Sequence, residues 1–406
     1  MAILTLTATA PADVLTEKPR IASIDIMRGI VMVIMALDHA RDFYHADAFV
    51  YDPLDLERTT PFLFFTRFIT HFCAPTFVLL AGTAVRISER RKSKREISWF
   101  LFTRGVWLVL LEVTVVRFGI FGNLYYDVLI FQVIWAIGFS MMLLSAAVHL
   151  PFKAIVALGL VITAGHDVLH VITLSPEAPN AVLWSFIHQS GFRELAPGVS
   201  ALIPYPFVPW FGILLLGYSL GEWYSKGFDS ERRKKLLIRT GIFAIALFIL
   251  LRTFNIYGDP APWSEQRNAV FTFLSFMNVT KYPASLQYTL VTLGPVLILL
   301  SMLEKTKTAM LGPFEIIGRV PLFYYILHFY LLHLGAIVLL MIRSGRSLSE
   351  IDFHFSAGMG GIPFGEGYPL IGAYIAWISV VLFLYPFCVW YDRYKSRHKR
   401  WWLSYL

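Results

Sequence analysis

The sequence is poor in charged residues and in cysteine. Only 15% of its 406 residues are Asp, Glu, Lys or Arg, whereas 57% are hydrophobic, which exceeds what a soluble domain normally carries. The two cysteines, Cys73 and Cys388, both lie in apolar segments, so a disulfide framework is excluded. No basic region precedes the weak apolar stretch at the N-terminus. A cleaved signal peptide is therefore not expected, and 1–20 is interpreted as a short cytoplasmic tail.

Apolar segments of membrane-spanning length recur along the chain. They predict an all-α fold, a polytopic integral membrane helical bundle of about ten transmembrane helices. We expect one transmembrane domain over 21–392 and a basic cytoplasmic tail over 393–406. The predicted spans are 22–40, 60–82, 99–118, 128–148, 153–172, 207–223, 237–254, 284–302, 320–342 and 369–390.

Lys and Arg are concentrated in a few connections between these spans. If the N-terminus is cytoplasmic, alternation places Arg86 to Arg95, Lys226 to Arg239 and the tail Arg393 to Arg400 on the cytoplasmic side, as the positive-inside rule requires. Both termini are then cytoplasmic. Topology and contact with lipid headgroups explain the net charge of +8, so the lipid bilayer is the expected partner and nucleic acid is not. A bacterial plasma (inner) membrane is the simplest location.

Long connections lie on the opposite, outer side. They are rich in Pro, Gly and aromatic residues, and long structured loops on one face usually carry function. A polar substrate is therefore expected at the outer face. These connections are 173–206, 255–283 and 343–368.

The first span carries charged groups that a simple anchor would not contain. In RIASIDIMRGIVMVIMALDHARDFYH, Arg28 and His39 are eleven residues apart, which places them on one helix face, about 16 Å apart along the axis. Asp25 and Asp42 lie near that line at its two ends. Such groups are costly in lipid unless they face a protein interior or a wet cavity. This helix is predicted to form the wall of a site, in which Asp42 or Asp38 orients the His39 imidazole.

Polar side chains in other spans add candidate site residues. Arg67 and His71 are one turn apart in the second span, and Pro75 is expected to kink that helix and free a carbonyl near His71. Glu112 is interpreted as the buried partner of an arginine rather than as an acid catalyst. His328 and His333 are interpreted as packing residues rather than ligands. The remaining candidates are Gln132, Trp135 and Tyr324.

The motif HDVLH places His166 and His170 one turn apart near the outer end of the fifth span. Two histidines at this spacing can chelate zinc. The motif lacks the Glu of HExxH and no third ligand is identifiable by spacing, so no metal is predicted. A serine hydrolase is also not predicted, because the sequence has no G-x-S-x-G.

Several of these stretches resemble one known family. They are similar to the bacterial multi-pass proteins named after the catalytic domain of heparan-α-glucosaminide N-acetyltransferase, over nearly the whole chain from about Arg20 to Arg393. The pattern Arg28, ten residues, His39 also resembles the wider transmembrane acyltransferase group, including the acyltransferase-3 family. The stretches are IDIMRGIVMVIMALDHARDF, FTRFITHFCAPTFVLLAG, RGVWLVLLEVTVV, VIWAIGFSMMLL and GRVPLFYYILH.

The resemblance implies transfer of an acyl group, commonly acetyl, from cytoplasmic acetyl-CoA to a glycan, amino sugar or other polar acceptor across the membrane. Such an enzyme needs a general base or a nucleophile. In the lysosomal enzyme that gives the family its name, the position matching His39 resembles an Asn. The histidine linked to acetyl transfer in that enzyme lies in the segment just after this helix. The candidates are therefore ranked His39, then His71, then His45.

The other site residues are assigned by role. Arg28 is expected to meet the pantetheine or phosphate part of the CoA thioester, and the basic cytoplasmic loops its 3′-phosphate. Asp25, Arg67 and Arg319 complete the expected donor site. The expected acceptor site consists of His45, Glu112, Trp135, Tyr324 and His328.

Two other functions remain compatible with the sequence. A transporter or flippase for a lipid-linked sugar would use the same buried charges as a translocation path, although inverted halves with broken helices are not found. A non-catalytic membrane protein would use its histidines to sense pH or metal. For the acyltransferase we expect the first, second, third and ninth spans to surround a polar cavity.

Overall fold

The structure is a computed structural model that describes residues 21–89, 93–304, 306, 309–398 and 400–404. The predicted tail 1–20 lies outside the described residues. Most of the described chain is helical. The longer helices are α1 (Ala22–Tyr44), α2 (Pro61–Thr70), α3 (Cys73–Glu89), α4 (Lys94–Leu111), α6 (Val133–Ala147), α7 (Phe152–Gly165), α9 (Phe207–Leu220), α10 (Ser230–Phe254), α12 (Leu286–Leu303), α14 (Pro321–Ser344) and α15 (Leu370–Arg397).

Short helices and two small sheets connect them. Parallel β1 and antiparallel β2 flank β3, and β4 pairs with β5 in the antiparallel sense. The short elements are α5 (Arg117–Phe121), α8 (Ala181–Ile187), α11 (Ala269–Met277), α13 (Gly312–Arg319), β1 (Val128–Ile130), β2 (Gly191–Ala196), β3 (Val199–Ile203), β4 (Gly358–Met359) and β5 (Ile362–Pro363).

All ten predicted spans contain a helix, although 128–148 begins with β1, and ten membrane crossings are not confirmed. Seven helical segments of the described chain are long and apolar enough to cross a membrane. Charged residues interrupt α1, and α6 and α9 have 15 and 14 residues, fewer than the roughly 20 that a bilayer requires. The seven are Pro61–Glu89, Lys94–Phe121, Phe152–Val171, Ser230–Phe254, Leu286–Leu303, Pro321–Ser344 and Leu370–Arg397.

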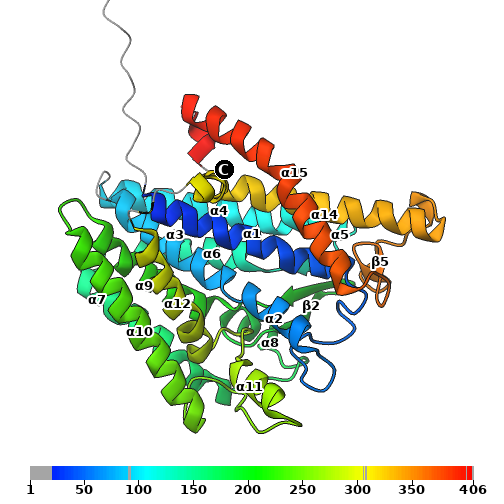
Figure 1. The fold of residues 1–406 in the computed structure, drawn as a ribbon, viewed down its shortest axis with the longest axis horizontal. Coiled ribbons are helices and arrows are strands. Elements are labelled where there is room, and N and C mark those ends of the chain that lie inside the picture. The colour runs from blue at the N-terminus through cyan, green and yellow to red at the C-terminus, as the bar shows by residue number, and fades with distance from the viewer. Residues whose placement is uncertain (1–20, 90–92, 305, 307–308, 399, 405–406) are drawn as a thin grey trace, which may run out of the picture.

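Helix α1 is the central helix of the bundle. Figure 1 shows it between the α7 and α10 side and the α14 and α15 side, and it packs against α13, α15, α14, α3, α2 and α12. Its crossing with α13 depends on two glycines. A Cβ on Gly29 would lie 1.8 Å from the Phe314 carbonyl oxygen, and one on Gly318 would lie 1.8 Å from that of Asp25. Small residues therefore let the two backbones touch.

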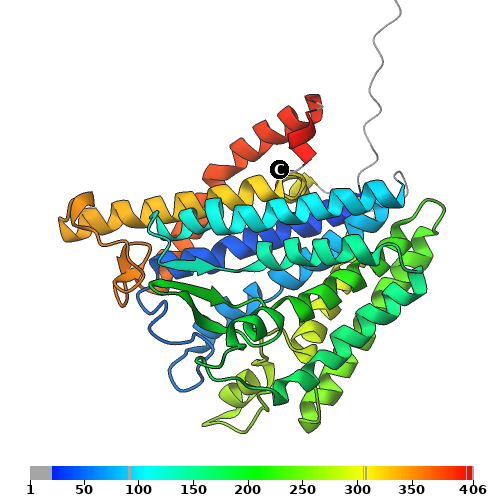
Figure 2. The same ribbon diagram turned by 180° about the vertical axis from the view of Figure 1, so that it is seen from behind.

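The two ends of the bundle differ in character. At the basic end, where α1, α4 and α10 begin and α3, α12 and α15 end, Arg86 pairs with Glu222 at 2.7 Å and with Glu89 at 2.9 Å, and Arg233 pairs with Glu304. At the loop end, where α1 ends and α2 begins, the three-stranded sheet and α8 cover the helices (Figure 2). The prediction of an all-α bundle is thus right for the helices and misses these small sheets. Strands β2 to β5 form inside connections interpreted as loops, whereas β1 occupies the start of the predicted span 128–148.

Candidate functional site

A cavity of about 390 Å³ lies between α1, α3, α4, α6, α13, α14 and α15. Its mouth at the basic end carries four cationic side chains, Arg28, Arg104, Arg319 and Lys395. Its walls are largely apolar and include Met32 and Leu108, with Tyr325 and the first turn of α6 farther in. The expected polar cavity is therefore wrong in character: the cations gather at one end of an apolar space. The acidic residues of α1 do not add a polar lining, because they pair with cations of the protein: Asp25 with Arg28 and Asp38 with Arg67.

The cations at the mouth belong to ion pairs and hydrogen bonds. Arg28 donates to Asp25 at 3.0 Å and to the Gly318 carbonyl at 3.1 Å. Arg319 pairs with Glu315 and, at 3.4 Å, with Asp392. The structure thus brings together the predicted residues Arg28, Asp25 and Arg319. It does not bring Arg67 to this mouth.

His39 and His328 face each other beyond the inner end of the cavity. Their ring centroids are 5.2 Å apart, and the Phe329 ring lies 4.2 Å from His39. His39 Nδ1 lies 3.6 Å from an oxygen of Asp42, as predicted. Tyr325, which lines the cavity, is one turn before His328. The pair therefore stands between the cavity and the loop end.

A second polar cluster occupies the other side of α1. Asp38 forms an ion pair with Arg67 of α2, and Arg41 lies 3.3 Å from the same carboxylate. Lys281 is only 6% exposed and acts on Asp38 electrostatically. Arg67 also donates to the Tyr282 hydroxyl at 3.3 Å. Asp38 therefore balances cations and does not orient His39.

Tyr282 enters this cluster from a connection outside the spans. Burial opposes ionisation of its hydroxyl, but the positive charges of Lys281 and Arg67 outweigh burial and lower its pKa. The Tyr205 ring lies 5.4 Å from the Tyr282 ring, centroid to centroid. Burial raises the pKa of Tyr205, and the negative charge of an ionised Tyr282 hydroxyl raises it further. The connection thus contributes a cation and a phenol to the buried cluster.

The helix break predicted from Pro75 is present. Helix α2 ends at Thr70 and α3 begins at Cys73. The freed carbonyl of His71 accepts a hydrogen bond of 2.8 Å from the Tyr288 hydroxyl. The His71 ring is 1% exposed, and neither of its nitrogens has a hydrogen-bond partner among the described residues.

Glu112 caps a helix and does not pair with an arginine. It is fully buried, and its Oε2 accepts a 2.9 Å hydrogen bond from the backbone N–H of Trp135 in the first turn of α6. Carboxylates are stabilised at helix N-termini. The predicted arginine partner is therefore wrong, because the start of α6 supplies the N–H donors. Glu112 also begins a π-helical turn, Glu112–Val116, a distortion frequent at functional sites.

The remaining candidates lie just after α1 and along α14. His45 follows α1, with Nε2 4.0 Å from Asp47, and burial lowers its pKa although Asp47 opposes this. Tyr324 is buried with its ring 5.8 Å from His328. His333 is held by the carbonyls of Gly119 and Gly360, at 3.0 and 2.6 Å.

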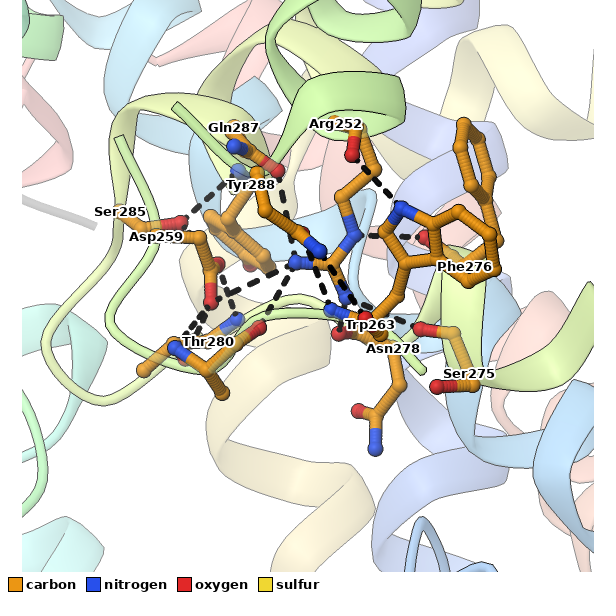
Figure 3. Close-up of polar contacts among 12 residues, drawn as sticks. Arg252, Asp259, Trp263, Ser275, Phe276, Asn278, Thr280, Ser285, Gln287 and Tyr288 are labelled. Carbon is orange, nitrogen blue, oxygen red and sulfur yellow. Dashed lines mark hydrogen bonds and ion pairs between the residues drawn. The ribbon is translucent and has the colours of Figure 1, made fainter. Parts of the chain in front are cut away.

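The connection that carries Lys281 and Tyr282 is wrapped around Arg252, at the end of α10 (Figure 3). The Arg252 guanidinium donates to the carbonyls of Phe276, Ala261, Ser275 and Asn278 at 2.6 to 2.9 Å. Asp259 lies 3.8 Å away and accepts from the Thr280 N–H at 2.8 Å and from the Ser285 hydroxyl at 2.7 Å. This Arg252 cluster fixes the segment that supplies the second polar cluster.

Sequence reasoning missed several of these residues. Arg104 and Lys395 lie in or beside apolar segments, where they are indistinguishable from interfacial cations. Lys281 and Tyr282 lie in a connection with no periodicity, and only the run Lys-Tyr-Pro marks them. Each reaches its site through tertiary packing, which the local sequence does not specify.

The histidines of HDVLH meet a third histidine. The His188 ring lies 5.6 Å from that of His166 and 4.6 Å from that of His170, and Asp167 lies 3.0 Å from His170 Nε2. Within the described ranges, no group of three or more His, Cys, Asp or Glu side chains is placed to hold a metal ion.

We expect this histidine cluster to make stability depend on pH. Burial, with the nearby His170 and His166, lowers the pKa of His188 to about 4, whereas an unfolded histidine titrates near 6.5. Below about pH 6.5 the unfolded chain therefore binds the extra proton first, so stability falls from there to about pH 4 and then levels off. Thermal unfolding of the purified protein across this range measures the fall, and His188→Gln should reduce it. Equal pH profiles for variant and wild type would contradict this expectation.

The fold and the site define a class, a multi-pass membrane protein with an internal cavity that is cationic at its mouth and whose lining ends at Tyr325, one turn before the buried His328. Residues 20–258 match the family described as heparan-alpha-glucosaminide N-acetyltransferase, catalytic, and the chain belongs to this family. The family implies an enzyme of the acetyltransferase type, and the resemblance seen in the sequence is confirmed. A comparison with curated proteins gives no match.

Proposed function

We propose that this protein transfers an acetyl group from acetyl-CoA to a hydroxyl or amino group of a glycan or amino sugar. The donor enters at the basic end and the acceptor at the loop end. The observation that supports this proposal best is the cavity itself, which leads from four cationic side chains to Tyr325. His328 follows Tyr325 by one turn of α14, and its ring lies 5.2 Å from that of His39. A donor with phosphates at one end and a thioester at the other matches that polarity.

In this proposal the mouth binds the phosphates of CoA. Guanidinium groups bind phosphate oxygens in a bidentate manner, and Arg28, Arg104 and Arg319 supply three of them, with Lys395 as a fourth cation. Asp25 holds Arg28 in place. The apolar walls contact the pantetheine arm. Arg67, which pairs with Asp38, has no part in donor binding.

His39 is the proposed general base. Its Nδ1 faces Asp42, so its Nε2 can take the proton of the attacking hydroxyl or amine, and the carboxylate stabilises the imidazolium that results. His71 ranks below it because His71 is only 1% exposed, whereas the His39 side chain is 14% exposed. His45 ranks third. Acceptor contacts by His45, Glu112, Trp135, Tyr324 and His328 remain part of the proposal.

The orientation follows from the positive-inside rule. Arg28 near the start of α1 and Lys395 near the end of α15 line the same mouth, which supports placing both ends of the described chain on one side. We assign the basic end to the cytoplasm of a bacterial cell and the bilayer to its plasma membrane.

The test is release of free CoA and formation of acetylated acceptor by the purified protein, with acetyl-CoA and pooled amino sugars and glycans. His39→Ala is expected to lower turnover by about 10²-fold or more, since a positioned base contributes at least that much. His71→Ala, at the break between α2 and α3, and His45→Ala, directly after α1, serve as comparisons. Loss in His71→Ala or His45→Ala with full activity in His39→Ala would reassign the base. Substrate flux into vesicles without CoA release would favour the transporter instead.

A further inference from the structure

His328 has an unusual environment for a packing residue. It lies on α14, beyond the residues that match the family, and its side chain is fully buried. Its Nδ1 lies 3.2 Å from the Tyr324 carbonyl oxygen. Because a carbonyl only accepts hydrogen bonds, Nδ1 carries the proton, and Nε2 is left with its lone pair. Nε2 has no hydrogen-bond partner among the described residues, and a buried orphan of this kind calls for an explanation.

The position of His328 explains why its Nε2 has no partner. Helices α1 and α14 run in the same direction, since His39 meets His328 and, one turn on, Phe43 meets His333 at 5.0 Å. Along this pair of helices the cavity lining ends at Tyr325, and His328 follows one turn later. His328 is therefore the first histidine beyond the cavity, and His39 stands next to it.

The surroundings of the two histidines differ. His39 has Asp42 beside it and its side chain is 14% exposed, as a base that meets an acceptor requires. His328 forms no ion pair in the described part of the chain and is enclosed by the rings of Tyr324, Tyr325 and Phe329. An apolar shell that excludes water protects a reactive acyl group from hydrolysis.

We infer that His328 is the nucleophile that receives the acetyl group and that His39 serves the acceptor, an inference that rests on the proposed function. In the first step His328 Nε2 attacks the thioester carbonyl carbon, the carbon–sulfur bond breaks, and CoA leaves as the thiolate. The product is an acetyl-imidazolium whose Nδ1–H still donates to Tyr324. In the second step the acceptor oxygen or nitrogen attacks the acetyl carbon, and the bond to Nε2 breaks. His39 takes the acceptor proton, so His328 returns to its neutral form.

The experiment measures covalent label. Purified protein is incubated with acetyl-CoA labelled in the acetyl group, without acceptor, then denatured at neutral pH, and protein-bound label and released CoA are counted. Wild type should carry label and release a burst of CoA stoichiometric with the protein. His39→Gln should keep label and burst but lose transfer to acceptor. His328→Gln should lose both while still binding CoA within about threefold of wild type, which shows that it is folded. His354→Gln, an exposed histidine at the loop end, should match wild type.

Three results would overturn the inference. Label that persists in His328→Gln, or that disappears in His39→Gln, reverses the roles of the two histidines. A wild type that turns over with acceptor yet never carries label transfers acetyl directly, which leaves the proposed function standing. A wild type that neither binds CoA nor releases it from acetyl-CoA overturns the proposed function together with this inference.

Discussion

Replacing Asp38 by Asn is expected to lower the free energy of unfolding by about 3 to 5 kcal/mol, the usual cost of removing one partner of a buried ion pair. Arg67 is paired with Asp38, and Arg41 and Lys281 lie within reach of the same carboxylate. All three cations are largely shielded from water. Without the carboxylate they repel one another where solvent cannot screen them.

Thermal and denaturant unfolding in detergent measures the loss, with Glu57→Gln, a change at an exposed acid before α2, as the control that should shift stability little. Combining Asp38→Asn with Arg67→Gln removes the unpaired cation and should recover part of the stability. A double variant as unstable as the sum of the single variants would show that the two residues are not coupled.

Much of the site was predictable because it is local to single helices. The spacing of Arg28, His39 and Asp42 placed a polar face on α1, and the structure brings His39 and Asp42 together. Pro75 predicted both the break before α3 and a freed carbonyl near His71. These inferences needed only helical geometry and the missing N–H of proline.

The rest depends on which helices meet, and hydropathy does not encode that. Glu112 was expected to pair with an arginine, yet the N-terminus of α6 satisfies it. The sequence predicts a packing role for His328, and nothing in its own helix indicates that the His39 ring lies 5.2 Å away. Strands β2 to β5 and α8 lie inside connections predicted as loops, and β1 lies at the start of the predicted span 128–148. Strands as short as the three residues of β1 carry no readable alternation.

Replacing Arg252 by Leu is expected to have an equally large effect, about 5 kcal/mol, and to act first on one segment. Arg252 is 1% exposed and donates to four backbone carbonyls, and each buried carbonyl left unpaired costs about 1 to 3 kcal/mol. Asp259, whose side chain is also 1% exposed, would lose the cation beside it. Arg252→Lys keeps the charge but not the planar fork of donors, so it should recover only part of the loss.

Hydrogen exchange locates the effect of Arg252→Leu, because the Arg252 guanidinium holds four backbone carbonyls between Ala261 and Asn278. Amides around Thr280 should exchange faster than those of α12 and α14 well below the unfolding temperature. Arg267→Ala, at an exposed arginine of the same connection that stacks 3.6 Å from the Phe271 ring, should cost about 1 kcal/mol or less. If exchange rose equally throughout the bundle, Arg252 would stabilise the whole fold. If it rose only in this segment, Lys281 and Tyr282 would owe their place beside Asp38 to an arginine at the far end of another helix.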